Sequence, residues 1–316
     1  LALILSALIL FKLIPSPAFQ TGIRNLKLSI LLAMPLIGYE LSNSQNKIFA
    51  LFFVLLAILL FERKRMFLSA LSLNIAAVIY VPIVFFALYF ILRSRGRFIP
   101  HFILALAAVF IILPSIVFGF SFNNFLLQEW FKNSLNPFAL TSTYSSYIDL
   151  RSSSHSLPSA VGRMLVSGST GSFNYRIPAH AIHMIIKGCS AGLLLISSAA
   201  IWKKRRDNVR GLGYILFLFL ALLLPQYCIY YTWAWLFVAY FVLLNCLSDP
   251  QLTALEKRIL LISIFVLVFS SFSIVIHLFN HFSFLFFGTL AAWSGITFVL
   301  FAEKEEPDLK PLTKRE

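Results

Sequence analysis

The sequence predicts an all-α fold, a polytopic transmembrane helical bundle with about 9–11 membrane segments. Hydrophobic residues make up 59% of the 316 residues, the mean hydropathy is +0.87, and only 12% of the residues are charged. Soluble domains carry about 25% charged residues. Apolar runs of about 20 residues recur along the whole chain, and each can cross a hydrocarbon core roughly 30 Å thick. Together these observations exclude a soluble globular protein.

Nine apolar spans follow one another along the chain, and we expect each to cross the membrane as a helix. One further segment, 66–92, has 27 residues and is long for a single span. It contains Asn74 near its middle and Pro82 a little further along. The nine spans are 1–14, 28–42, 47–61, 98–119, 178–201, 211–225, 227–247, 259–278 and 282–302.

Short clusters of Lys and Arg lie between pairs of these spans, and such a pair returns the chain to the side on which it began. The clusters therefore predict the orientation of the chain. With the clusters on the cytoplasmic side, 20 of the 26 basic residues are cytoplasmic, as the positive-inside rule expects. The net charge of +14 is therefore a topology signal, and we expect no nucleic-acid partner. Because 66–92 has a cluster on each side, it must enter and return on one side as two short, broken helices. Such a hairpin is tolerated where it is buried in protein or lines a cavity.

This topology predicts a single transmembrane domain over 1–302 in the inner membrane, followed by a charged cytoplasmic tail, 303–316. One long outer loop, 120–177, is too long to be structureless. It contains an amphipathic piece, 125–132, whose Trp and Phe residues are typical of a helix lying in the membrane interface. The chain starts at Leu1 inside an apolar run, with no initiator Met, so we expect it to be truncated at the N-terminus.

The outer side is the place to look for chemistry, because ionisable residues near the membrane are costly and mark function. In the stretch 154–165, Ser and Pro residues can start a helix. The N-terminus of that helix, together with Arg163, could converge on an anion. The alternative is a capped interfacial helix whose Arg163 reaches out to the interface.

Two further groups on the outer side each have a functional and a structural interpretation. His180, His183 and Lys187 share one helical face, which could meet phosphate, ligate a metal or only reach to the interface; no carboxylate or Cys lies near them, so we expect no metal site. The aromatic run from Tyr227 to Trp235 could stack on a sugar or belong to an aromatic belt.

The order of several stretches resembles glycosyltransferase family 87, the polyprenol-phosphate-dependent, mannosyltransferase-like branch of the GT-C superfamily. The resemblance covers about residues 28–247. Ser42-Asn43-Ser44-Gln45-Asn46 stands where the family has a Gly-Gln-x-Asn turn, and 66–92 with Pro82 resembles the family's Gly/Ala-rich segment followed by Lys and Pro. The run 126–135 resembles the family's Leu-x-x-Trp segment, and Leu224-Pro225 stands where the family has a Ser-Pro-x-x-Trp segment. His155-Ser156-Leu157-Pro158 followed by Arg163 is similar to the family's Asn-Gln-Ser-Leu-x-x-x-x-x-Arg motif.

The resemblance implies a GT-C-like fold and transfer of a mannose-like hexose from a polyprenyl-phosphate donor to a lipid or glycan acceptor, with no cofactor. A carboxylate would deprotonate the acceptor hydroxyl, which attacks the anomeric carbon while polyprenyl phosphate departs. We expect His155, Ser156, Arg163 and Lys187 around the donor phosphate or sugar, and Gln45 towards the sugar.

Two departures from the family pattern affect these assignments. The superfamily places its catalytic Asp or Glu in a first outer loop, which here would precede Leu1, so the catalytic base is unknown and Glu129 and Asp149 are weak candidates. The Lys that precedes Pro in the family is absent before Pro82. We expect its phosphate contact to be lost, or to be supplied by Lys47 or Arg163.

Other functions predict other features. A transporter or lipid flippase would carry paired ionisable residues at mid-membrane and an internal repeat, neither of which is clear here. A non-catalytic membrane scaffold and a lipid-linked sugar polymerase remain alternatives. For each of these functions we expect membrane lipids to surround the chain.

Overall fold

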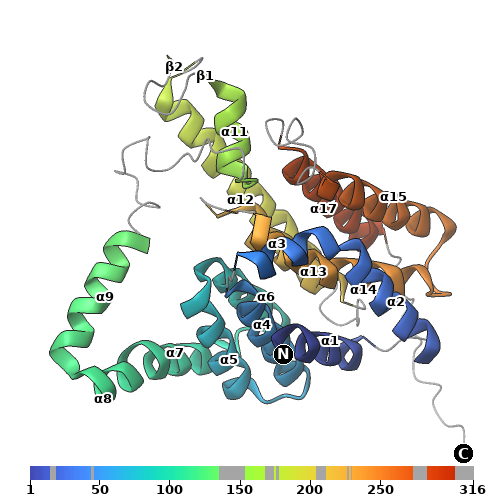
Figure 1. Ribbon diagram of the computed structural model, residues 1–316. Helices are drawn as coiled ribbons and strands as arrows, with labels where there is room; N and C mark the ends of the chain where they lie inside the picture. Colours follow the sequence, from blue (N-terminus) through green and yellow to red (C-terminus); the bar gives the residue numbers. More distant parts are fainter. Residues whose placement is uncertain are drawn as a thin grey trace, which may run out of the picture.

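The computed structural model describes residues 1–14, 19–43, 46–134, 154–167, 174–175, 178–203, 211–225, 228, 230–272 and 283–302. These residues are almost entirely helical, with one two-stranded antiparallel pair (Figure 1). The elements are α1 (Ala2–Leu13), α2 (Phe19–Leu32), α3 (Met34–Ser42), α4 (Lys47–Glu62), α5 (Met66–Ile79), the 3₁₀ helix η1 (Val81–Val84), α6 (Phe85–Arg93), α7 (Ile99–Ala107), the π-helical η2 (Ala108–Ile112), α8 (Leu113–Phe118), α9 (Phe120–Ser134), α11 (Leu157–Leu165), β1 (Val166–Ser167), β2 (Asn174–Tyr175), α12 (Ala179–Lys203), α13 (Leu212–Leu223), the 3₁₀ helix η4 (Tyr230–Trp235), α14 (Leu236–Leu247), α15 (Ala254–Ser271) and α17 (Phe284–Ala302).

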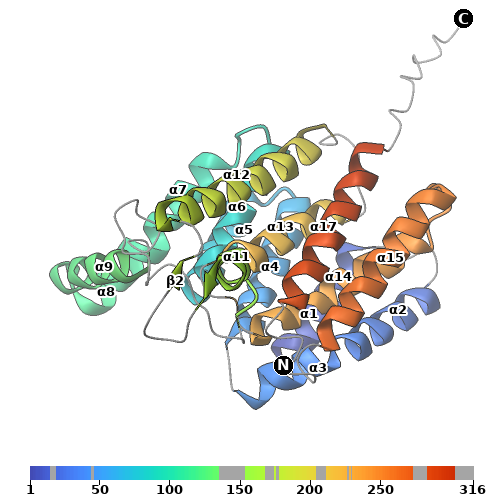
Figure 2. The same ribbon diagram turned by 90° about the horizontal axis from the view of Figure 1, so that it is seen from above.

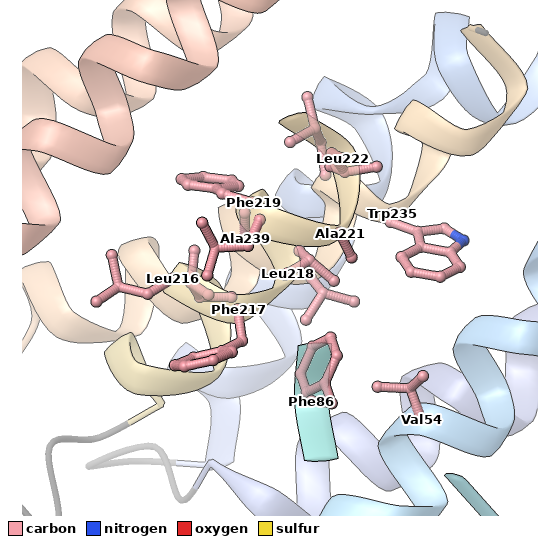
Figure 3. Packing of buried hydrophobic residues seen from close by; sticks show 14 of the residues in the cluster. Val54, Phe86, Leu216, Phe217, Leu218, Phe219, Ala221, Leu222, Trp235 and Ala239 are labelled. Carbon is pink, nitrogen blue, oxygen red and sulfur yellow. The ribbon is translucent and has the colours of Figure 1, made fainter. Parts of the chain in front are cut away.

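Helix α13 forms the centre of the bundle. It is apolar on all sides, and every one of its residues except Tyr214 is buried. A helix that is hydrophobic all round needs neighbours on every side, and α13 packs against α6, α12, α14 and α17. In Figure 3, Phe217 and Phe219 point away from α13 in different directions, and Phe86 faces it from α6.

The predicted break in the segment 66–92 is confirmed. Helix α5 ends at Ile79, Tyr80 is extended (φ −149°, ψ 98°), and Pro82 lies in the 3₁₀ turn that starts α6. Proline has no N–H to continue the hydrogen bonds of α5 and is tolerated only in the first turn of a helix, which is where Pro82 lies. The sequence therefore interrupts the segment at this point.

Contacts at the two ends of α4 show that the broken segment returns to the end where it began. At the start of α4, Lys47 contacts the carbonyl of Ile79. At the end of α4, Glu62 accepts a hydrogen bond from Tyr214, whose ring lies 5.2 Å from that of Tyr89 in α6. The basic clusters on both sides of the hairpin thus share one end of the bundle. We call it the basic end, where α4 ends and α13 begins.

Two helix boundaries differ from the predicted spans for local reasons. The predicted span 28–42 is two helices, because Pro35 in the first turn of α3 cannot continue α2 through Ala33. The predicted span 259–278 begins earlier, at Ala254. There Thr253 and Glu256 form a capping box that satisfies free N–H groups at the start of α15.

Close packing joins α15 to α17, the two C-terminal helices. A Cβ atom on Gly295 would lie 2.6 Å from the hydroxyl of Ser263, and one on Gly288 would overlap the side chain of Ser270. Small residues at these positions let the two backbones approach each other.

Three helices among the described residues are long and apolar enough to cross a membrane, and the other apolar helices are shorter. The first two are mostly exposed, with 6% and 28% of their apolar stretches buried, whereas the third is 56% buried. Water would not tolerate so large an exposed apolar surface. The chain is therefore a membrane protein. The three helices are Ile99–Phe118, His180–Trp202 and Phe284–Ala302.

Residues 99–134 form an arm that projects from the bundle (Figures 1 and 2). Figure 1 shows that the arm turns sharply between α8 and α9. Gly119 makes this turn at φ +82°, a conformation open to glycine. The buried amide of Asn123 fixes the turn by donating to the carbonyl of Phe110 at 3.1 Å and to the hydroxyl of Ser115 at 3.0 Å. The helix predicted at 125–132 is confirmed as part of α9.

Candidate functional site

Stretches that lie far apart in the sequence meet at the end of the bundle opposite the basic end. They join the start of α4, the break between α5 and α6, the start of α11, the segment before η4, and the residue before α17. We call the group the polar cluster. It consists of Glu40, Lys47, Ile79, Tyr80, Ser154, His155, Ser156, Ser159, Arg163, Cys228, Trp235 and Ser283.

Lys47 stands at the centre of one half of the polar cluster. Its half-buried ammonium donates to the carbonyl of Ile79 at 3.3 Å and lies 5.0 Å from the centre of the Tyr80 ring, within cation–π range. The indole N–H of Trp235 donates to the backbone carbonyl of Lys47 at 3.0 Å, and the Tyr80 and Trp235 rings pack edge to face. The start of α4 is thereby fixed to the break after α5.

Glu40 supports the same turn from α3. Its carboxylate is 1% exposed, and Oε1 accepts a hydrogen bond from the backbone N–H of Ile48 at 3.2 Å. Ile48 is the second residue of α4, where backbone N–H groups have no partner within the helix. A carboxylate at this position satisfies one such donor and complements the positive end of the helix dipole. Glu40 is thus a cap for α4 supplied by the preceding helix.

The segment before α11 forms the other half of the polar cluster. The N–H of His155 donates to the carbonyl of Cys228 at 2.9 Å, and the N–H of Cys228 donates to the Ser154 hydroxyl at 3.4 Å. The Cys228 thiol also interacts with Tyr80 and Lys47. These contacts connect the two halves, although 74 positions in sequence separate Ser154 from Cys228.

Three serines hold the start of α11. The hydroxyl of Ser159 lies 2.8 Å from that of Ser154 and 3.1 Å from that of Ser156, and all three residues are fully buried. Ser156 also accepts from the backbone N–H of Ser159 at 3.5 Å, which is the position of a helix N-cap. The short helix predicted in 154–165 is confirmed, and serine starts it as expected.

Arg163 ties this segment to the C-terminal helices. Its Nη2 donates to the carbonyl of Ser154 at 2.6 Å, and its Nε donates to the hydroxyl of Ser283 at 3.0 Å. Ser283 is buried and has φ +56°, a left-handed conformation that is strained for residues other than glycine. Surrounding contacts, the guanidinium among them, must hold it there. In this structure Arg163 therefore positions both ends of the cluster.

His155 is fully buried in the polar cluster. Burial, and secondarily the positive charge of Arg163, lowers its pKa from 6.5 to about 3. The imidazole is therefore neutral at physiological pH. A neutral imidazole can donate from one ring nitrogen and accept at the other, which suits contact with hydroxyl groups better than with a phosphate.

The other predicted site residues fall in different places. Lys187 is half-buried in α12, which packs against α11, so it lies on a helix adjoining the cluster. Glu129 is on the arm, in a surface ion pair with Lys132 at 2.8 Å. Gln45 and Asp149 lie outside the described residues.

The helical face of His180 and His183 is present in α12, with His180 exposed and His183 buried. No group of three or more potential metal ligands (His, Cys, Asp and Glu) occurs in the described part of the chain. In the aromatic run, Trp233 and Trp235 are fully buried, so their rings serve neither a lipid-facing belt nor a sugar platform. Both rings are structural.

The family model of glycosyltransferase family 87 matches residues 1–225. The match covers well over half of the chain. The chain belongs to glycosyltransferase family 87. No curated protein and no solved structure matches it.

The family-87 match confirms the resemblance seen in the motifs, and it assigns the chain to the glycosyltransferases. It includes Glu40, Lys47, Tyr80 and the whole 154–163 segment, but not Cys228 or Trp235, nor Ser283 in the region of α15 and α17. The C-terminal helices therefore complete the polar cluster from outside the matched region.

Proposed function

We propose that this glycosyltransferase transfers a mannose-like hexose from a polyprenyl-phosphate-linked donor to a lipid or glycan acceptor. The supporting observation is the polar cluster itself, a set of buried hydroxyls, an imidazole and two cations at one end of an otherwise apolar bundle. Buried polar groups are costly and, near a membrane, mark function. A lipid-linked sugar phosphate would present its polar part at this depth.

The proposed location is the outer face of the inner membrane, with the C-terminus in the cytoplasm. Three basic clusters, 63–65, 93–97 and 203–210, flank helices that meet at the basic end. The positive-inside rule assigns this end to the cytoplasm. The polar cluster is at the other end and would face the outer leaflet, where acceptors on the outside of the membrane are in reach.

Within the site, His155, Ser156 and Arg163 would surround the donor sugar and phosphate, with Gln45 towards the sugar and Lys187 beside them. Transfer breaks the bond between the anomeric carbon and the phosphate oxygen, and the phosphate leaves with the electron pair. Fixed positive charge stabilises the negative charge that develops on it. A neutral His155 suits the sugar hydroxyls, and Arg163 shapes the segment that carries both His155 and Ser156.

The acceptor hydroxyl must lose its proton to a carboxylate as it attacks the anomeric carbon. Glu129 lies on the projecting arm and pairs with Lys132, which does not favour it. Asp149 stays a weak candidate. The resemblance implies that the family's catalytic Asp or Glu lies in a first outer loop, which here would precede Leu1. That assignment stays a prediction.

The test is transfer of radiolabelled mannose from a polyprenyl-phosphate donor in membranes that contain the protein. We expect Arg163→Ala to lower transfer at least tenfold, because a charge-assisted contact and the order of the 154–163 segment are both lost. Arg258→Ala, which removes an exposed arginine of α15, is the matched control and should leave transfer unchanged. Full activity of Arg163→Ala would remove the 154–163 segment from the proposed site.

A further inference from the structure

The two cations of the polar cluster have different surroundings. Arg163 donates to Ser154 and to Ser283 with two of its nitrogens. The ammonium of Lys47 contacts one carbonyl, at 3.3 Å, and the face of one aromatic ring. No carboxylate oxygen in the described part of the chain lies within 4.0 Å of it. An ammonium has three N–H donors, so Lys47 keeps donors for an anion.

The position of Lys47 makes a bound anion favourable. The side chain is half-buried, where surrounding protein weakens water screening and strengthens the attraction between opposite charges. It is also the first residue of α4, and the positive end of a helix dipole adds to its own charge. The cost of partly burying this charge is not offset by an ion pair within the described residues.

Glu40 attracts this cation, although no oxygen of its carboxylate lies within 4.0 Å of the ammonium. One carboxylate oxygen caps the N–H of Ile48, next to Lys47. The other oxygen is buried and has no hydrogen-bond partner among the described residues. A 1% exposed carboxylate with one oxygen unused is expensive. Glu40 can therefore orient the start of α4, which carries Lys47, while its second oxygen can still accept a hydrogen bond.

The backbone and the ring beside Lys47 are equally fixed. Trp235 is fully buried and donates to the Lys47 carbonyl, while Tyr80, 8% exposed, donates its hydroxyl to the carbonyl of Ala221 at 3.1 Å. Tyr80 is thus fixed to α13, and Trp235, the last residue of η4, is fixed to the start of α4. The ammonium therefore has a defined location before any ligand binds, as an electrostatic site needs.

We propose that Lys47 directly contacts the phosphate of the lipid-linked substrate, and that Glu40 is the positioning residue that orients it. This inference rests on the proposed function. It adds a binding residue outside the 154–163 segment and gives a role to the buried carboxylate of α3. The Cys228 contacts that join Lys47 to the backbone of His155 put the phosphate contact next to the segment proposed for the sugar.

The experiment measures binding of polyprenyl monophosphate, and of the corresponding uncharged polyprenol, to the purified full chain in nanodiscs. Lys47→Gln should weaken binding of the phosphate about tenfold and leave binding of the alcohol unchanged. Lys47→Arg should retain most of the affinity for the phosphate, because the charge is kept. Lys257→Gln, at a half-buried lysine in the first turn of α15, is the matched control and should bind both lipids normally.

Glu40→Gln tests the positioning role, because glutamine keeps an oxygen for the Ile48 N–H while removing the charge. We expect a severalfold loss of phosphate affinity with unchanged alcohol affinity and an unchanged thermal midpoint. A merely structural role would lower the midpoint and affect both lipids alike, and that result would overturn the role of Glu40. If Lys47→Gln binds the phosphate as tightly as the unaltered chain, Lys47 is not the contact. If the unaltered chain itself does not prefer the phosphate to the alcohol, the proposed lipid-phosphate donor is wrong instead.

Discussion

The polar cluster and the arm contain similar residue types in different surroundings. Both contain aromatic rings, serine hydroxyls and a lysine close to a glutamate. In the polar cluster the rings are buried, and several contacts join parts of the chain that are distant in sequence, as in the 188 positions between Lys47 and Trp235. In the arm the rings around the turn, such as Phe118, Phe122 and Phe125, are exposed, and Lys132 pairs with Glu129 only three residues away.

This difference separates two kinds of polar group in a membrane protein. An exposed pair such as Lys132 and Glu129 contributes little, because solvent screens it. A buried group such as Glu40 is costly and persists only where packing holds it. The arm can therefore change with small effect on the rest of the bundle, whereas the polar cluster should be sensitive at each position.

The largest expected effect comes from truncating a ring of the polar cluster. Trp235→Ala removes a fully buried indole and its hydrogen bond to the Lys47 carbonyl, and such a cavity costs about 3–5 kcal/mol. Phe125→Ala removes a ring of the arm that is 55% exposed, and should cost about 0.5 kcal/mol or less. Thermal unfolding of both variants in the same detergent compares them. Equal shifts in the midpoint would show that the two regions are not different in kind.

Much of the bundle could be predicted from the sequence, because its determinants are local. Pro82 with a basic cluster on either side was enough to predict the broken hairpin, and the Ser-Leu-Pro-Ser start of α11 was enough to predict that helix. The division at Ala33 was missed, although Pro35 was visible, because the apolar run continued through both residues. The hydrophobic pattern predicts that the segment is apolar, but it does not show whether the segment forms one helix or two.

The polar cluster could be predicted only in part. The motif around His155 and Arg163 was found because polar residues in a helix start are rare in such a chain. Ser283 carried no signal, since a single serine at the start of an apolar span looks the same whether or not an arginine reaches it. The sequence left open whether Lys47 or Arg163 would face a phosphate. Only their three-dimensional contacts show that Arg163 already donates to Ser154 and Ser283, whereas the Lys47 ammonium contacts one carbonyl and one ring.

An intermediate effect is expected from pH, through His155. Its pKa is about 3 in the folded protein and about 6.5 in an unfolded chain. Between these values the unfolded chain binds a proton that the folded protein does not, so stability from this residue is complete above pH 6.5 and falls as the pH is lowered. The loss reaches about 2 kcal/mol at pH 5.

The measurement is the thermal midpoint at pH 7.5, 6 and 5 for the unaltered chain and for His155→Gln. The glutamine cannot take up a proton, so the variant should lose less stability between pH 7.5 and 5 than the unaltered chain does. Groups elsewhere titrate in both proteins and cancel in the difference. The same pH dependence in both proteins would mean that His155 is not held neutral by burial.

The smallest effect on the whole molecule, and the sharpest test of the arm, comes from Asn123. Its buried amide joins α9 to the π-helical turn and to Ser115, so Asn123→Ala leaves these groups unsatisfied at a cost of about 1–3 kcal/mol. Because α9 packs against α8 and η2, that cost should appear as local opening rather than as loss of the bundle. Amide hydrogen exchange in 120–134 should accelerate while exchange in α13 and the thermal midpoint stay unchanged. Asn124→Ala, at the exposed neighbour, should change neither. If Asn123→Ala instead lowered the midpoint as Trp235→Ala does, the arm and the polar cluster would unfold as one cooperative unit. The two regions would then differ only in how exposed their side chains are.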